Sequence, residues 1–155
     1  MIKSNEISGQ KQKMDQKVRE AIFKAVKIEP FARALQMELV DLEDGYSLVH
    51  MIYEPEKMNN IYARAHGGAL YSLIDEAFET AGQTDGTIAV ALNVNVTYVS
   101  SPEPGQRLQA EARRVSQTRR TASYDIKVTD NNGQVIALCQ ALAFRTGKAI
   151  PIPFL

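Results

Sequence analysis

The chain has 155 residues, of which 45% are hydrophobic and 23% charged, and this composition is that of one ordinary globular domain with a sizeable core. The 18 basic and 18 acidic residues cancel, which argues against general affinity for nucleic acid, though not against a local basic patch. A single cysteine, Cys139, excludes an internal disulfide and favours a reducing compartment. No apolar run is long enough to cross a membrane, and residues 1–13 lack the apolar segment of a signal peptide. We therefore expect a cytoplasmic protein that binds neither membranes nor nucleic acid.

Residues 1–29 are predicted to form a helical extension before the main domain. After a polar segment, apolar side chains recur every four positions over about 11–27, which is the spacing of one helix face. These side chains are Met14, Val18, Ile22 and Val26. Because this face is narrow, we expect it to pack on the domain or on a neighbouring subunit rather than on a membrane surface. Pro30 ends the helix, and residues 30–35 are expected to add a short helical turn.

Residues 36–54 are typical of a β-hairpin. Two strand-like runs flank Glu43-Asp44-Gly45, which is a favourable turn sequence. His50 lies in the second run with no catalytic partner motif near it, so a structural role is favoured.

The stretch 58–82 combines a glycine turn with a long amphipathic helix. Gly67 and Gly68 allow a tight turn and leave backbone N–H groups accessible at the helix start. The apolar side chains that follow share one helix face and are Leu70, Leu73, Ile74, Ala77, Phe78 and Ala81. Asp75 lies off this face, about 20° around the helix from Gly68 and about 10 Å further along its axis.

Two interpretations of this strip remain open from spacing alone. In the first, the glycines only break a loop and Asp75 is a solvated helix acid. In the second, the N–H groups of the turn form an oxyanion hole, and Asp75 acts as general base or nucleophile on an acyl carbon held there.

The segment after the central helix is predicted to form an antiparallel meander. Its strands are 87–99, 106–116, 121–130 and 134–145, with a tight turn at 131–133. The first strand is apolar and β-branched, so we expect partial burial of both its faces. Cys139, in the last strand, is expected to be a buried, inert thiol, and the apolar tail 149–155 is expected to dock on its own or a neighbouring subunit. The order of elements predicts an α+β fold, with one curved antiparallel sheet packed on one long central helix.

The central motif resembles that of hotdog-fold acyl-CoA thioesterases of the phenylacetate-pathway, or PaaI-like, type. The family pattern is an Asn, a His-Gly-Gly six residues later, and an acid nine residues after the His. Asn60, the turn 66–68 and Asp75 fit all three spacings. The resemblance extends over roughly residues 30–146. It implies a hotdog domain over 30–155, in which the sheet wraps around the central helix, preceded by the helical extension.

The resemblance further implies hydrolysis of an acyl-CoA thioester in a site between the subunits of a homodimer or homotetramer. Asn60, His66 and Gly67 would come from one chain and Asp75 from its partner. The N–H of Gly67, with that of Gly68, would bind the carbonyl oxygen, and Asp75 would activate a water or attack directly. Asn60 would orient the water or the carbonyl, and His66 would position the turn. No separate cofactor is implied, because CoA is part of the substrate.

Because CoA carries phosphates, a basic contact is also expected. The candidates are Arg64, Arg113, Arg114, Arg119 and Arg120, although hairpin arginines are equally often plain solvated charges. Glu76 and Glu79 are reserve acids that we expect to be solvated, and Glu79 would raise the pKa of Asp75 by like-charge repulsion. No metal site is expected, since the two histidines and one cysteine lack ligand spacing.

Two positions depart from the family pattern. Ala63 stands where many relatives have Gly, and Ala91 stands nearest to the Ser or Thr with which some relatives hold the water. Tyr71 and Tyr98 are candidates for the acyl pocket, though core packing accounts for them equally well.

The alternative function is a non-catalytic acyl-CoA-binding module, which would not need Asp75. A hotdog dehydratase would need a differently placed pair of His and acid.

Overall fold

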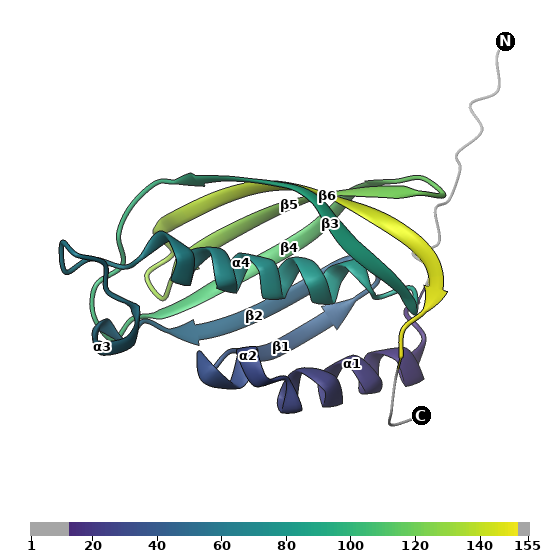
Figure 1. Ribbon diagram of the computed structural model, residues 1–155, viewed down its shortest axis with the longest axis horizontal. Coiled ribbons are helices and arrows are strands. Elements are labelled where there is room, and N and C mark those ends of the chain that lie inside the picture. The colour runs from purple at the N-terminus through teal and green to yellow at the C-terminus, as the bar shows by residue number, and fades with distance from the viewer. Residues whose placement is uncertain (1–12, 152–155) are drawn as a thin grey trace, which may run out of the picture.

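The computed structural model describes residues 13–151 as a curved antiparallel sheet of six strands with one long helix against its inner face (Figure 1). The strand order is β1-β2-β4-β5-β6-β3. The elements are α1 (Gln16–Ile28), α2 (Pro30–Ala34), β1 (Glu38–Glu43), β2 (Tyr46–Ile52), α3 (Pro55–Met58), α4 (Gly67–Gly82), β3 (Thr87–Tyr98), β4 (Arg107–Gln117), β5 (Thr121–Asp130) and β6 (Val135–Ala149). The predicted polar segment 1–10 and most of the apolar tail lie outside the described residues.

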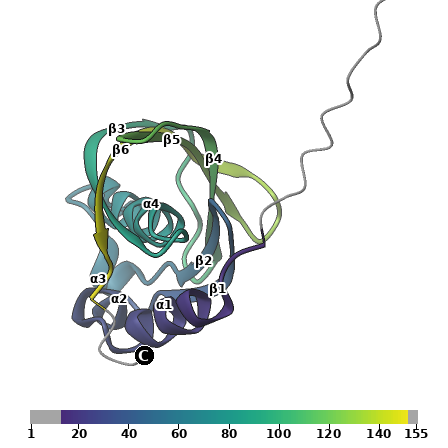
Figure 2. The same ribbon diagram turned by 90° about the vertical axis from the view of Figure 1, so that its right-hand side faces the viewer.

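The sheet wraps around α4, as Figure 2 shows in a view along the helix. In the same view α1 and α2 lie across the open side of the curve, between β1 and the end of β6. The predicted α+β hotdog architecture is therefore confirmed, including a helix before the first strand.

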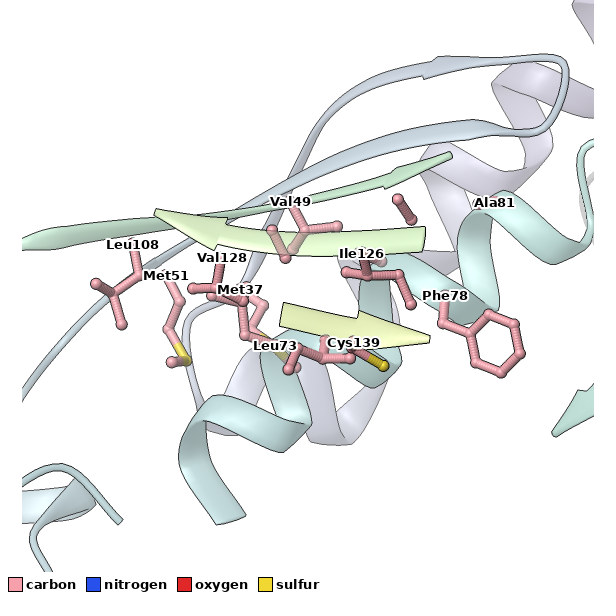
Figure 3. Packing of buried hydrophobic residues seen from close by; sticks show 14 of the residues in the cluster. Met37, Val49, Met51, Leu73, Phe78, Ala81, Leu108, Ile126, Val128 and Cys139 are labelled. Carbon is pink, nitrogen blue, oxygen red and sulfur yellow. The ribbon is translucent and has the colours of Figure 1, made fainter. Parts of the chain in front are cut away.

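Helix α4 is held in place by its apolar face. All six side chains predicted for this face are buried, and they belong to one core cluster with the inward side chains of β2, β4 and β5. Figure 3 shows three of them, Leu73, Phe78 and Ala81, within this cluster. Phe78 packs edge-on against the ring of Tyr124, with 5.3 Å between ring centroids. Removing a leucine, isoleucine or phenylalanine side chain from water contributes about 1.5–3 kcal/mol, which is why the helix lies inside the sheet.

The far end of α4 is tied to the β1–β2 hairpin. Thr84 Oγ1 accepts a hydrogen bond from the Gly45 N–H at 2.8 Å, and both groups are buried. Gly45 adopts a positive φ of 67° and lies so close to Arg114 that a Cβ would come within 2.8 Å of that side chain. The predicted turn is thus confirmed, and glycine is required there by conformation and by space.

The helical extension packs on its own domain. Asp15 caps α1 by accepting the N–H of Lys17 at 2.7 Å. Ile22 and Val26 belong to the buried core, and Met14 and Val18 pack partly buried against it. The predicted apolar face of this helix therefore packs on the domain rather than on a membrane surface. Within residues 13–151 no helix has the length and apolarity needed to cross a membrane.

Strand β3 differs from its prediction. We expected partial burial of both faces, but in the single chain β3 is the most exposed strand, with Leu92 57% exposed. The reason is its position at the sheet edge, where it pairs only with β6. Apolar, β-branched side chains on an unpartnered edge are typical of a strand that pairs with another chain.

The short helix α3 was not predicted, and β6 continues to Ala149, beyond its predicted end.

Candidate active site

The loop before α4 is shaped by Asn60. Its Oδ1 accepts hydrogen bonds from the N–H of Tyr62 at 2.9 Å and of Arg64 at 3.2 Å. Its own N–H donates to the Arg64 carbonyl at 2.8 Å. Ala63, inside this loop, has a positive φ of 57°, a conformation that glycine adopts without strain and alanine does not. The backbone therefore explains why glycine is suited to position 63.

His66 forms the N-cap of α4. Its Nδ1 accepts the Gly68 N–H at 2.8 Å, so Nδ1 carries no proton and the Gly68 N–H is already satisfied. The N–H of Gly67 donates to no acceptor within residues 13–151. Of the two predicted donors, Gly67 is consequently the one that remains free at the positive end of the helix.

Tyr98, on β3, closes over this helix start. Its hydroxyl donates to the Gly67 carbonyl at 3.0 Å, and a Cβ on Gly67 would lie 3.1 Å from the ring carbon Cζ. Tyr98 is 51% exposed and Tyr71 is 37% exposed, so neither is buried in the core of its own chain. The contact joins residues 31 positions apart, and no local pattern in the sequence indicates it.

Asp75 lies half-buried at the middle of α4, beside a cavity of about 200 Å³ between the helix and β3. Glu79, Ala89 and Ala91 are among the residues that line the cavity with it. Burial raises the pKa of the Asp75 carboxyl above its ordinary value. Ala91 lines the same cavity as Asp75 and offers no hydroxyl there.

One chain does not bring Asp75 and Gly67 together. They lie on the same straight helix, eight residues apart, which corresponds to about 12 Å along the axis. Reacting groups in an enzyme site meet at about 3–3.5 Å. A site that uses both residues on one carbonyl therefore requires a second chain.

Comparison with known proteins supplies the family. A model of the thioesterase superfamily matches residues 62–137. A putative esterase of Archaeoglobus fulgidus is 29% identical over 144 residues, which cover 93% of this chain and 91% of that protein. The acyl-coenzyme A thioesterase PaaI of Escherichia coli is 29% identical over 119 residues, which cover 77% of this chain and 84% of that protein.

Solved structures agree with the sequence matches. The E. coli PaaI protein superposes with a TM-score of 0.83 at 26% identity, covering 88% of this chain and 98% of that chain. The protein smu.793 of Streptococcus mutans, solved bound to acetyl CoA, superposes with a TM-score of 0.69 at 30% identity, covering 73% of this chain and 90% of that chain. The chain belongs to the thioesterase superfamily. The predicted PaaI-like resemblance is confirmed, and with it the prediction that the protein is a hydrolytic enzyme.

In this thioesterase Glu79 is exposed as predicted, whereas Glu76 is not, and Glu79 is not what raises the pKa of Asp75. Glu76 was expected to be solvated, but it is only 3% exposed, because its position on α4 faces Glu29 at the end of the extension rather than solvent. Glu79 lies at the surface, where it accepts a hydrogen bond from Gln83 Nε2 at 3.3 Å. Its pKa is raised by partial desolvation and by the charge of Asp75, whereas burial alone raises the pKa of Asp75.

The arginines of the thioesterase lie in two separate places. Arg113 pairs with Glu111 at 2.7 Å and stacks over the Tyr46 ring, and Arg114 pairs with Asp44. The exposed pair 119–120 forms the β4–β5 turn, at the opposite end of α4 from Gly67 (Figure 1). Arg64 is exposed in the loop before α4. Of the five candidate arginines, therefore, Arg64 is the one that lies near the helix start within one chain.

Two other side chains fit their predicted structural roles. Cys139 is buried, and burial raises the pKa of its thiol to about 11, so the thiol stays protonated and unreactive. His50 is half-buried in β2, and its Nε2 has no hydrogen-bond partner within the described part of the chain. Burial, with the nearby charge of Arg107, lowers the pKa of His50, so the ring is neutral at pH 7.

Proposed function

We propose that this thioesterase hydrolyses an acyl-CoA thioester to the free acid and CoA. The observation that carries the proposal is the free Gly67 N–H at the start of α4, together with the half-buried carboxylate of Asp75 on the same helix. The relatives support the substrate class, since E. coli PaaI is an acyl-coenzyme A thioesterase and the S. mutans protein was solved with acetyl CoA.

The thioester carbonyl would accept the Gly67 N–H. Attack on the carbonyl carbon moves negative charge onto its oxygen, and the helix start offers a fixed donor and a positive dipole end to that charge. One such donor typically lowers the barrier by about 3–4 kcal/mol. His66 contributes by fixing the turn through its bond to Gly68, and Tyr98 by anchoring the Gly67 carbonyl.

Asp75 would take a proton from the attacking water. The water oxygen bonds to the acyl carbon, the carbon–sulfur bond breaks, and the proton passes from Asp75 to the departing CoA sulfur. A partly desolvated carboxylate with a raised pKa is a stronger base than a solvated one. Direct attack by Asp75, through an anhydride, is the less favoured route. Asn60 would act through its Nδ2, because its Oδ1 is engaged in the loop.

We further propose that the active site lies between two chains of a homodimer, or of a homotetramer built from such dimers. The support is the distance of about 12 Å between Gly67 and Asp75 along one helix, together with the exposed apolar edge strand β3 beside both residues. Pairing of β3 with a second copy would bury this edge. It would also bring a partner chain to the helix start that Tyr98 covers.

Mixing two inactive variants tests the shared site. In a dimer of one Asp75→Asn chain and one Gly67→Pro chain, one of the two sites keeps an intact Gly67 and an intact Asp75. We therefore expect a statistical mixture of co-expressed chains to recover about a quarter of wild-type activity. Activity no higher than that of the separate variants would contradict a site shared between chains.

For the CoA phosphates, we propose Arg64 together with Arg119 and Arg120 in preference to Arg113 and Arg114. The first three are exposed and have no acidic partner within residues 13–151, whereas the other two are paired with Glu111 and Asp44. Arg64 lies at one end of α4 and the pair 119–120 at the other. In this proposal they therefore contact one CoA molecule only when two chains form the dimer.

The direct test of the function is thiol release from a panel of short, medium, long-chain and aryl acyl-CoAs. We expect saturable turnover on at least one class, which also identifies the acyl preference. Binding of CoA esters without turnover on any member would contradict hydrolysis and would favour the alternative, a non-catalytic acyl-CoA-binding module.

A further inference from the structure

Three glutamates meet where the helical extension crosses α4. Glu29 joins α1 to α2, and Glu76 and Glu79 lie one turn apart on α4. One carboxylate oxygen from each lies within 4.8 Å of the other two. The cluster exists because α1 and α2 close the open side of the sheet directly beneath α4 (Figure 2).

Glu76 is the buried member of this cluster. Its side chain is 97% buried, and its Oε1 has no hydrogen-bond partner among residues 13–151. In the same part of the chain no lysine, arginine or histidine forms an ion pair with any of the three carboxylates. A buried carboxylate without a partner is costly, so the cluster requires either a proton or a cation.

The electrostatics of the cluster agree with this requirement. Burial, followed by the charges of Glu29, Glu79 and Asp75, raises the pKa of Glu76 to about 8. Burial and the charges of Glu79 and Asp75 also raise the pKa of Glu29. Glu29 and Glu79 thus destabilise the ionised form of Glu76, Glu79 destabilises that of Glu29, and a bound cation would relieve this repulsion.

Space for a cation and its waters lies beside the carboxylates. A cavity of about 220 Å³ opens between α1 and α4 and is lined by Glu29, Glu79, Thr80, Gln83 and Pro151, among others. Hard divalent cations bind carboxylate oxygens at about 2.0–2.6 Å, so two ligands of one ion lie at most about 5 Å apart. The spacing within 4.8 Å meets that limit.

We propose that Glu29, Glu76 and Glu79 form a binding site for a hard divalent cation, such as Mg²⁺, Mn²⁺ or Ca²⁺. The site clamps the helical extension to α4 one turn from Asp75. It has no His or Cys ligand and draws on positions 47 residues apart, which is why the sequence led us to expect no metal site.

Calorimetric titration of the full chain, freed of metal with EDTA, tests this site. With each of the three cations in turn, we expect one saturable site per chain for at least one of them, and a melting temperature that rises with its concentration. We expect Glu29→Gln and Glu79→Gln each to weaken that affinity by about tenfold or more, since each removes one of three charged ligands. The control Glu56→Gln, on exposed α3, should leave the affinity unchanged.

Glu76→Gln separates ligand loss from failure to fold. It keeps the shape of the side chain and removes the buried charge, so we expect a melting temperature without cation at least as high as that of wild type, and no further rise with cation. Absence of saturable binding of all three cations would overturn the proposal, because the cluster would then be neutralised by protons alone. Equal affinity in Glu29→Gln and Glu56→Gln would overturn it as well.

Discussion

We expect Asp75→Asn to lower kcat for acyl-CoA hydrolysis by roughly 10²–10⁴-fold, the usual contribution of a positioned general base. Asparagine keeps the size of the side chain and its place beside the cavity, but it cannot accept the proton of the attacking water. The carboxylate is not needed to hold the thioester, so the dissociation constant of a non-hydrolysable acyl-CoA analogue should change little. Steady-state thiol release and calorimetric binding of the analogue measure the two effects.

The control for this variant is Asp125→Asn. Asp125 is an exposed aspartate on β5, and the same loss of charge there should leave kcat unchanged. Full turnover in Asp75→Asn would remove Asp75 from the role of base. Glu79 would then become the next candidate, because it lines the same cavity and lies one turn further along α4.

The second large effect is expected from Gly67→Pro. Proline removes the one backbone N–H that we assign to the oxyanion, and loss of such a donor typically costs roughly 10²–10³-fold in kcat. The helix itself should tolerate the change, because Gly67 is its first residue and proline is favoured at that position. His66 has an extended backbone, with ψ 133°, which is the conformation required before proline. Circular dichroism and the melting temperature verify that the fold is kept.

Gly67→Ala is the matched control, because it introduces a Cβ but keeps the N–H. In both variants the Cβ lies about 3.1 Å from the Tyr98 ring, so both carry the same steric strain. The difference in kcat between proline and alanine therefore isolates the donor. Equal kcat values in the two variants would rule out the Gly67 N–H as a stabiliser of the transition state.

Local sequence pattern was sufficient for most of the fold. The apolar face of α4 repeats every three to four residues, and all of its predicted members are buried. The turns at Gly45 and Gly133 depend on residues adjacent in the chain, and both glycines adopt the positive φ that such turns require. These predictions succeeded because each depends on interactions within about ten residues, which periodicity and turn chemistry encode directly.

The sequence by itself determined the glycine turn at the start of α4, the order of the strands along the chain and the family motif of Asn60, His66 and Asp75. Only the tertiary structure decided that Tyr98 anchors Gly67, that Glu76 is buried beside Glu29, and that β3 lies exposed at the sheet edge. Each of these facts depends on which distant segments meet when the sheet curves around α4. That arrangement is set by burial summed over the whole domain, so a residue's neighbours across the fold cannot be recognised from its neighbours in the chain.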